Sequence, residues 1–129
     1  MEDIYIAGGA RTALGNFGGS LKDRPMTDLA AEITQAAIAR VGAEPKDFDH
    51  MVFTTTCPTD RDSLFSARVV GMKSDLPAEA GALDVSRACA SGLQAILAAG
   101  QQIATGHSQL AIAAGAEMFS RAPFAVTTS

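Results

Sequence analysis

Residues 80–106, "AGALDVSRACASGLQAILAAGQQIATG", join a short apolar run, a polar turn and a long alanine-rich segment. The run 80–86 predicts a strand, and the segment 89–106 predicts a helix that stops at Gly106. One face of this helix collects its larger apolar side chains around a glycine: Leu93, Ile96, Leu97, Gly100 and Ile103. A strand that leads directly into a helix is the building unit of parallel α/β sheets.

The same alternation continues on both sides of this stretch. β-rich runs at 3–8, 50–57 and 109–117 predict three further strands, and the segments 27–42 and 62–73 predict two further helices. Four strands separated by three helices favour right-handed crossovers on a mostly parallel sheet. The abundance of alanine and glycine in the helices indicates that several are covered on both sides. We therefore predict an α/β protein with a layered αβα arrangement.

The first predicted helix has clear boundary signals. Thr27 is expected to act as its N-cap, and Gly42 as its C-terminal stop. Its apolar face follows i, i+4 spacing through Leu29, Ile33, Ala37 and Val41.

Composition narrows the class of protein. The chain has 129 residues, a formal charge of −4 and no tryptophan, which gives no reason to expect nucleic acid as a partner. The first residues resemble neither a secretion signal nor a transit peptide, and no apolar run is long enough to span a membrane. The two cysteines, Cys57 and Cys89, are therefore expected to be reduced thiols in a cytoplasmic protein.

Cys89 is the main candidate for chemistry. It lies where the predicted strand 80–86 turns into its helix, at the sheet edge where open α/β proteins bind ligands. Unpaired N–H groups at a helix N-terminus stabilise a thiolate and an oxyanion formed on an attacked carbonyl. The alternative is that Cys89 is a small apolar side chain in a crowded corner. Position and small neighbours leave both interpretations open.

Other polar residues are interpreted as structural. Cys57 is expected to pack at a strand end, and Glu117 to accept hydrogen bonds at the end of the last strand. Arg11 and Thr12 are expected to anchor the opening loop through a buried guanidinium, and Arg68 to pair with a carboxylate.

Four segments, in order, resemble the thiolase family. "SRACASGLQAI" (86–96) resembles the segment that carries the acyl-accepting cysteine, N-x-x-C-[GAS]-S-G-[LM]. "ARTALGNFGGSL" (10–21) resembles the family's opening loop, and "SARVVGMKSDLP" (66–77) its helix and turn before the third strand. "QQIATGHSQLAIAAGAEMFSRAP" (101–123) resembles the run after the nucleophile helix.

This resemblance implies acyl transfer between coenzyme A thioesters in lipid metabolism. Cys89 would hold the acyl group as a thioester, and its backbone N–H would help to bind the oxyanion. The outcome would be Claisen condensation of acetyl-CoA or thiolytic cleavage of a 3-ketoacyl-CoA. No metal or redox cofactor is implied, and the partners would be acyl-CoA substrates.

The chain also departs from the family pattern. Ser86 stands where the family often has asparagine, and "AGAE" (114–117) replaces "GGxE". The family's catalytic histidine, second cysteine and most coenzyme A contacts lie in a part that these residues lack. His50 and His107 match no catalytic position and are expected in exposed loops.

The resemblance also implies how the chain is organised. Residues 1–120 would form most of the thiolase N-terminal αβα domain, and residues 121–129 would begin a loop domain. Activity would need a complementary C-terminal segment or chain. A homodimer or homotetramer is expected, with the edge strand 80–86 pairing across a two-fold axis.

Two alternatives remain open from the sequence. The first is a non-catalytic thiolase-like subunit or scaffold module. The second is a ketoacyl synthase-like condensing enzyme that acts on an acyl carrier, which a requirement for free coenzyme A would distinguish. Acyl chain length and physiological direction are not encoded in these residues.

Overall fold

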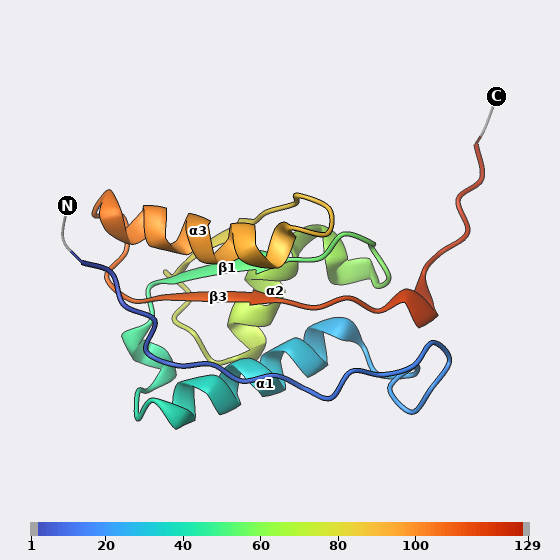
Figure 1. The fold of residues 1–129 in the computed structure, drawn as a ribbon, viewed down its shortest axis with the longest axis horizontal. Coiled ribbons are helices and arrows are strands. Elements are labelled where there is room, and N and C mark those ends of the chain that lie inside the picture. The colour runs from blue at the N-terminus through green and yellow to red at the C-terminus, as the bar shows by residue number, and fades with distance from the viewer. Residues whose placement is uncertain (1–2, 128–129) are drawn as a thin grey trace.

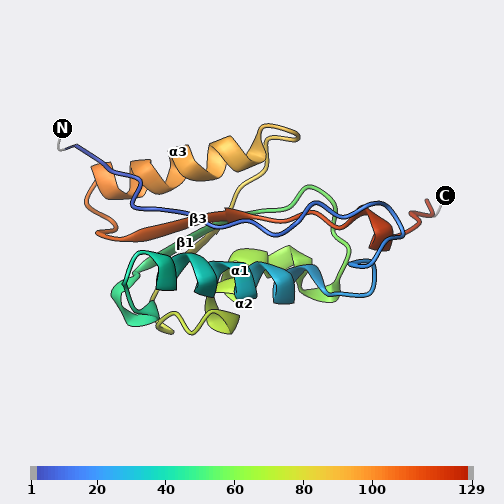
Figure 2. The same ribbon diagram turned by 60° about the horizontal axis from the view of Figure 1, so that its bottom comes forward.

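The computed structural model describes residues 3–127. Over this range a three-stranded parallel sheet has the order β2-β1-β3, with α3 on one face and α1 and α2 on the other (Figures 1 and 2). The strands are β1 (His50–Thr54), β2 (Gly81–Asp84) and β3 (Ala111–Gly115). The α-helices are α1 (Met26–Arg40), α2 (Ser66–Lys73) and α3 (Ser91–Ala104). The predicted α/β class and its layers are confirmed.

Helix α3 packs on the sheet through its smallest side chains. Val52 of β1 forms a buried cluster with Ala95, Ala98 and Ala99. Alanine side chains let the helix backbone come close to the strands, so the larger residues turn outward. Leu93 and Leu97 are 64% and 51% exposed. The apolar face expected from the sequence therefore exists, and it faces away from the sheet.

The opposite face of the sheet carries the larger core. Its buried members come from α1, β1, α2 and their connections, and include Met26, Ala30, Ile38, Met51, Phe53, Ala67 and Val70. The apolar face expected for α1 is at most partly buried, and the fully buried residues of this helix are Met26, Thr27, Ala30, Ala31, Thr34 and Ile38. Thr27 is not the N-cap, because the helix already begins at Met26 after Pro25. The Thr27 hydroxyl accepts a hydrogen bond from Lys73 Nζ at 2.8 Å.

The strand expected at 3–8 is absent from the described residues. The segment is irregular and exposed, with Tyr5 at 82% exposure. A strand is stable only when a neighbour completes its ladder, and within residues 3–127 the sheet pairs only the three strands above. A hydrogen bond of 3.1 Å from Arg40 Nη1 to the Gly9 carbonyl ties the end of this segment to α1.

The ends of the elements follow the sequence signals more closely. Gly42 and Gly106 have φ values of 69° and 75° just beyond α1 and α3, a conformation that glycine adopts without strain. The strands are shorter than predicted, because the segments after Thr54 and Gly115 leave the ladder for loops. None of the helices within residues 3–127 has the length and hydropathy needed to cross a membrane.

The C-terminal segment leaves the sheet after a short 3₁₀ helix, Phe119–Arg121. Residues 122–127 extend away from the layered body (Figure 1). This change of direction lies near the expected domain boundary at residue 120, which stays a prediction. Residues 128 and 129 of the expected loop domain lie outside the described residues.

Candidate functional site

The carboxyl ends of the strands gather the sequence-predicted residues at one edge of the sheet. Because the strands are parallel, the loops after Thr54, Asp84 and Gly115 leave the sheet in the same direction. Backbone hydrogen bonds extend the contact beyond the strands, from Val85 N to the Phe53 carbonyl at 3.0 Å and from Ala116 N to the Thr54 carbonyl at 3.1 Å.

A tight turn carries Cys89 between β2 and α3. Backbone hydrogen bonds of 3.1 Å join Ala90 N to the Arg87 carbonyl and Ser91 N to the Ala88 carbonyl. Ala88 has a φ of 48°, in the left-handed region of the backbone that residues other than glycine rarely adopt. The buried Ser91 hydroxyl accepts from Arg87 N at 2.6 Å and donates to the Ala88 carbonyl at 2.7 Å. The turn is therefore fixed on both sides of the cysteine.

Cys89 is a free, exposed thiol two residues before the first residue of α3. It is therefore accessible, and the interpretation of Cys89 as buried packing does not hold for the described residues. The amino end of a helix favours negative charge nearby, which suits a thiolate or the oxyanion of an attacked carbonyl. This arrangement can support nucleophilic attack by sulfur.

Glu117 joins the loop after β3 to the loop after β1. Its Oε1 accepts from Thr55 Oγ1 and Cys57 N, both at 3.1 Å, and its Oε2 accepts from Thr56 N at 2.9 Å and from the Thr56 hydroxyl. Partial burial raises the pKa of this carboxyl, but the hydrogen bonds from Thr56, Cys57 and Thr55 together outweigh it and hold the pKa below its ordinary value. The structural hydrogen-bonding role expected for Glu117 is confirmed.

The second cysteine and the histidines have different surroundings. Cys57 is a partly buried free thiol in the loop after β1. His107 is exposed before β3, and its Nδ1 lies 2.8 Å from Thr105 Oγ1. The expectation of an exposed loop for His50 is wrong. His50 is the first residue of β1, and its imidazole packs on Gly81, where a Cβ would lie 2.3 Å from His50 Nδ1.

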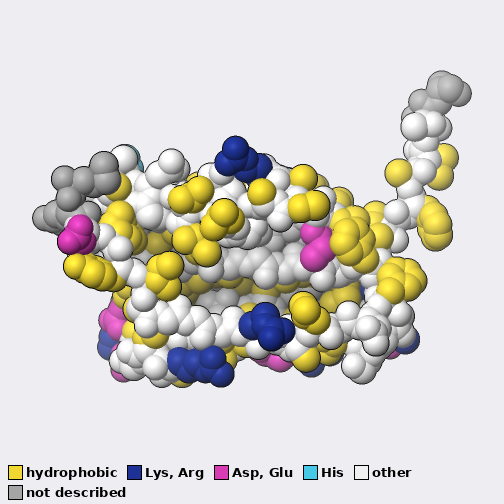
Figure 3. All heavy atoms as spheres, viewed as in Figure 1, with side chains coloured by type: hydrophobic (Ala, Val, Ile, Leu, Met, Phe, Trp, Pro, Cys, Tyr) yellow, Lys and Arg dark blue, Asp and Glu magenta, His cyan; other side chains and the backbone are white. Residues whose placement is uncertain are grey.

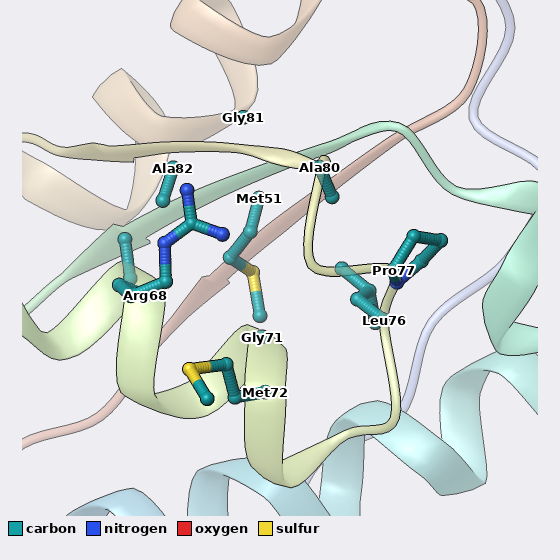
Figure 4. A pocket seen from close by; sticks show the side chains of 10 residues that line it. Met51, Arg68, Gly71, Met72, Leu76, Pro77, Ala80, Gly81 and Ala82 are labelled. Atoms are coloured by element: carbon teal, nitrogen blue, oxygen red, sulfur yellow. The ribbon is translucent and has the colours of Figure 1, made fainter.

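The arginines are bound locally. Arg11 is exposed and donates to the carbonyl of the adjacent Thr12 at 2.9 Å, so the predicted buried guanidinium is wrong. Arg68 donates to the Ala78 carbonyl at 3.2 Å instead of to a carboxylate. It lies over a crevice beside α2 with Met51, Met72 and other apolar side chains (Figure 4). This crevice is too narrow to hold a water molecule.

A larger hollow lies beside the free edge of β3. It encloses about 530 Å³ between the opening loop, α1 and the residues after β3, and its wall includes Leu14, Phe17, Leu29, Ile33 and Met118. Figure 3 shows this side of the molecule hollowed along its middle. Neither hollow found in the described residues is lined by the turn around Cys89. The thiol instead lies on an open surface. Within residues 3–127, no group of three or more acidic, cysteine or histidine side chains is placed to hold a metal ion.

Sequence reasoning missed the residues that shape the turn. Ser91 has an available signal, because a serine at a helix start often hydrogen-bonds the backbone of the preceding turn. Ala88 gives no signal of its left-handed conformation, since alanine is not a residue expected there.

The comparisons with known proteins agree with this geometry. A sequence profile described as the thiolase N-terminal domain matches residues 4–129. The chain belongs to the thiolase family. The chain is 40% identical over 123 residues to Beta-ketothiolase BktB of Cupriavidus necator, covering 95% of this chain and 31% of that protein. It is 32% identical over 126 residues to the mitochondrial 3-ketoacyl-CoA thiolase of Bos taurus, covering 98% and 32%.

Solved structures show the same fold. The crystal structure of human mitochondrial 3-ketoacyl-CoA thiolase in complex with CoA superimposes with a TM-score of 0.91 at 31% identity, over 95% of this chain and 31% of that one. The chain spans about a third of the length of these relatives. It therefore has a partial αβα thiolase fold.

Proposed function

We propose that this chain contributes the nucleophile to acyl transfer between coenzyme A thioesters. The observation that carries the proposal is the exposed Cys89 thiol in the turn before α3, within a chain that belongs to the thiolase family. The names of relatives support the substrate class, since they include an acetyl-CoA acetyltransferase and 3-ketoacyl-CoA thiolases.

The chemistry proceeds in two covalent steps. The Cys89 thiolate attacks the carbonyl carbon of an acyl-CoA, a carbon–sulfur bond forms to Cys89, and coenzyme A leaves as its thiol after taking up a proton. The α-carbanion of a second acyl-CoA then attacks the acyl group, forms a carbon–carbon bond and expels the Cys89 thiolate. Thiolysis of a 3-ketoacyl-CoA is the reverse. Splitting the reaction in this way replaces one difficult step with two easier ones.

Complementary residues are part of the proposal. The groups that remove and return protons, and the walls around the open Cys89 surface, come from a complementary segment or chain. The free edge of β2 supports pairing between copies, because within residues 3–127 this strand is bonded only to β1. We therefore expect a homodimer or homotetramer in the cytoplasm, and sedimentation velocity of the purified protein tests the oligomer.

The test is thiolysis of a short 3-ketoacyl-CoA by free coenzyme A, followed through loss of substrate absorbance. The protein is used at its natural length. Cys89→Ala is expected to reduce kcat/KM by at least about a thousandfold, because the covalent step is lost. Cys57→Ala is the matched control, since it removes the other thiol, and is expected to keep activity within about threefold. Equal activity of wild type and Cys89→Ala contradicts the proposal.

The two alternatives are separated by the same assay. A scaffold module has no activity with any acyl-CoA in the wild type. A ketoacyl synthase-like enzyme works with an acyl carrier protein and is indifferent to free coenzyme A. The names of the matched relatives favour coenzyme A over a carrier.

A further inference from the structure

We infer that Ser91 is a positioning residue for Cys89, and that its hydroxyl holds the turn at 87–90 in the conformation that presents the thiol. This inference rests on the proposed function, because it assigns Ser91 a part in the same reaction. Ser91 acts through the backbone around Cys89 and not by contact with substrate.

The hydroxyl bridges the residues just before the cysteine. It accepts the Arg87 N–H at 2.6 Å and donates to the Ala88 carbonyl at 2.7 Å. Ser91 is only 3% exposed, so water does not readily replace either bond. One side chain therefore satisfies a donor and an acceptor of the turn at the same time, and its loss leaves both without that partner.

The bridged backbone is strained at Ala88. An alanine in the left-handed region is strained relative to one in the right-handed region. The structure keeps this conformation, with φ at 48°, while the following residue is Cys89. Rotation of Ala88 to a relaxed φ would redirect the chain at Cys89. The two Ser91 hydrogen bonds oppose that rotation because they fix the groups on both sides of the Ala88 Cα.

The outer side of the turn is held by a weaker contact. Arg87 Nη1 donates to Gln94 Oε1 at 2.9 Å across the first turn of α3, where Arg87 is exposed and Gln94 is partly exposed. Exposed contacts of this kind contribute little because water competes for them. The buried hydroxyl of Ser91 is thus the side chain best placed to determine where the thiol lies relative to the amino end of α3.

The experiment uses the protein at its natural length and two readouts. The first is the single-turnover rate at which acetyl-CoA acetylates Cys89, measured by intact mass. The second is the rate of Cys89 alkylation by iodoacetamide at one pH, measured on the Cys89 peptide. Ser91→Ala is expected to slow acetylation about tenfold to a hundredfold, because a small displacement of a reacting group is costly. It is also expected to lower the alkylation rate, because the thiol is displaced from its place before the amino end of α3.

Matched variants separate positioning from stability. Ser66→Ala removes another buried serine hydroxyl at a helix start, one that donates to Asp84 beside α2. It is expected to lower the melting temperature as Ser91→Ala does, and to leave both Cys89 readouts at wild-type values. Ser91→Thr keeps the hydroxyl and is expected to restore most of the acetylation rate.

Each outcome decides the inference. Alkylation and acetylation rates for Ser91→Ala equal to wild type overturn it, as do equal effects of Ser66→Ala. If the wild type is never acetylated, the proposed function fails, while the alkylation rate still decides the role of Ser91. If Ser91→Ala does not fold, the double variant with Ala88→Gly is measured instead. It is expected to be acetylated more slowly than Ala88→Gly alone, because glycine leaves the turn free to rotate and the hydroxyl is then its remaining restraint, and equal rates overturn the inference.

Discussion

Single residues at the carboxyl edge of the sheet decide where groups can approach one another. Gly115 ends β3 opposite Thr54, and a Cβ at Gly115 would lie 2.6 Å from Thr54 Cγ2 and 3.2 Å from the Thr54 carbonyl oxygen. Thr54 is itself buried, so it has little room to move. Gly71 in α2 differs, because a Cβ there would meet Met51 and Leu76 at ordinary contact distances of 3.7 and 3.8 Å.

These surroundings predict opposite effects for the same substitution. Gly115→Ala is expected to lower the free energy of unfolding by about 1–3 kcal/mol, because the added methyl group forces β1 and β3 apart. Gly71→Ala is expected to raise the free energy of unfolding by about 0.5–1 kcal/mol, because alanine loses less conformational entropy than glycine when the helix forms. Thermal unfolding of both variants under one set of conditions measures the difference. Similar melting temperatures for the two would contradict the close approach at Gly115.

At the scale of elements, two carboxylates fasten β1 and β3 at opposite ends. Before β1, Asp49 Oδ2 accepts from Gln109 N at 2.7 Å, and Asp49 also accepts the Ser108 hydroxyl. After β3, Glu117 binds the loop that follows β1, as described above. Slight burial raises the pKa of Asp49, but the hydrogen bonds from Ser108, Gln109 and Leu110 lower it by more. The pKa of Asp49 therefore also lies below its ordinary value. The folded state therefore favours the charged form of both carboxyl groups.

The lowered pKa values predict an acid-sensitive fold. A carboxyl whose folded pKa lies below its unfolded value stabilises the protein fully above the unfolded pKa, and this contribution is lost as pH falls through the folded one. The ordinary values are 4.5 for Glu117 and 3.8 for Asp49. Stability is therefore expected to fall below about pH 4.5.

Glu117→Gln tests this prediction. The substitution is expected to lower the free energy of unfolding by roughly 1 kcal/mol at pH 7, because the amide NH2 group then faces backbone N–H donors. It is also expected to reduce the dependence of the melting temperature on pH in the acid range. The measurement is a series of melting curves from pH 7 to 3. Glu79→Gln is a suitable control, because the structure gives Glu79 no hydrogen bond within residues 3–127. If the melting temperature of Glu117→Gln depended on pH as that of the wild type does, Glu117 would not stabilise the contact between the loops after β1 and β3.

The sequence predicted elements best where one segment contains its own signals. Strand β2, α3 and the glycine stops at 42 and 106 are local patterns, and the structure has them. The segment 3–8 also has strand composition, but a strand depends on a partner that composition does not reveal. The buried face of α1 was not recognised from the sequence because it combines Met26 and Ile38 with threonine and alanine.

The candidate site was predictable in part for the same reason. Cys89 is recognisable from its own motif, and its exposure and position before α3 agree with the prediction. The left-handed conformation of Ala88 and the hydrogen bonds of Glu117 to the loop after β1 depend on contacts between residues that single motifs do not specify. Arg11 was mispredicted because its guanidinium is exposed and bonds only the adjacent backbone. Arg68 donates to a backbone carbonyl instead of a carboxylate, and His50 packs on Gly81 instead of facing solvent.

At the scale of the whole molecule, large apolar side chains remain uncovered. Leu93, Ile96 and Leu97 form an exposed stripe on the outer side of α3, and Leu14 and Phe17 line the open hollow beside β3. Surfaces of this kind favour association. The 129-residue polypeptide expressed alone is therefore expected to self-associate, which light scattering coupled to size-exclusion chromatography measures.

Substitution of the stripe identifies its contribution. The double variant Leu93→Ser, Leu97→Ser is expected to reduce the associated fraction. Leu76→Ser is the control, because Leu76 is buried in the core and its loss should destabilise the fold instead. A monodisperse monomer of the unchanged 129-residue polypeptide would contradict this prediction.

The central claim is that Cys89 carries the acyl group, and one measurement addresses it directly. The protein at its natural length is incubated with acetyl-CoA, denatured, and weighed intact, together with Cys89→Ala and Cys57→Ala. Our account predicts one acetyl group on the wild type and on Cys57→Ala, located on the peptide that contains Cys89, and none on Cys89→Ala. An acetyl group retained in Cys89→Ala, or none on the wild type, would contradict it.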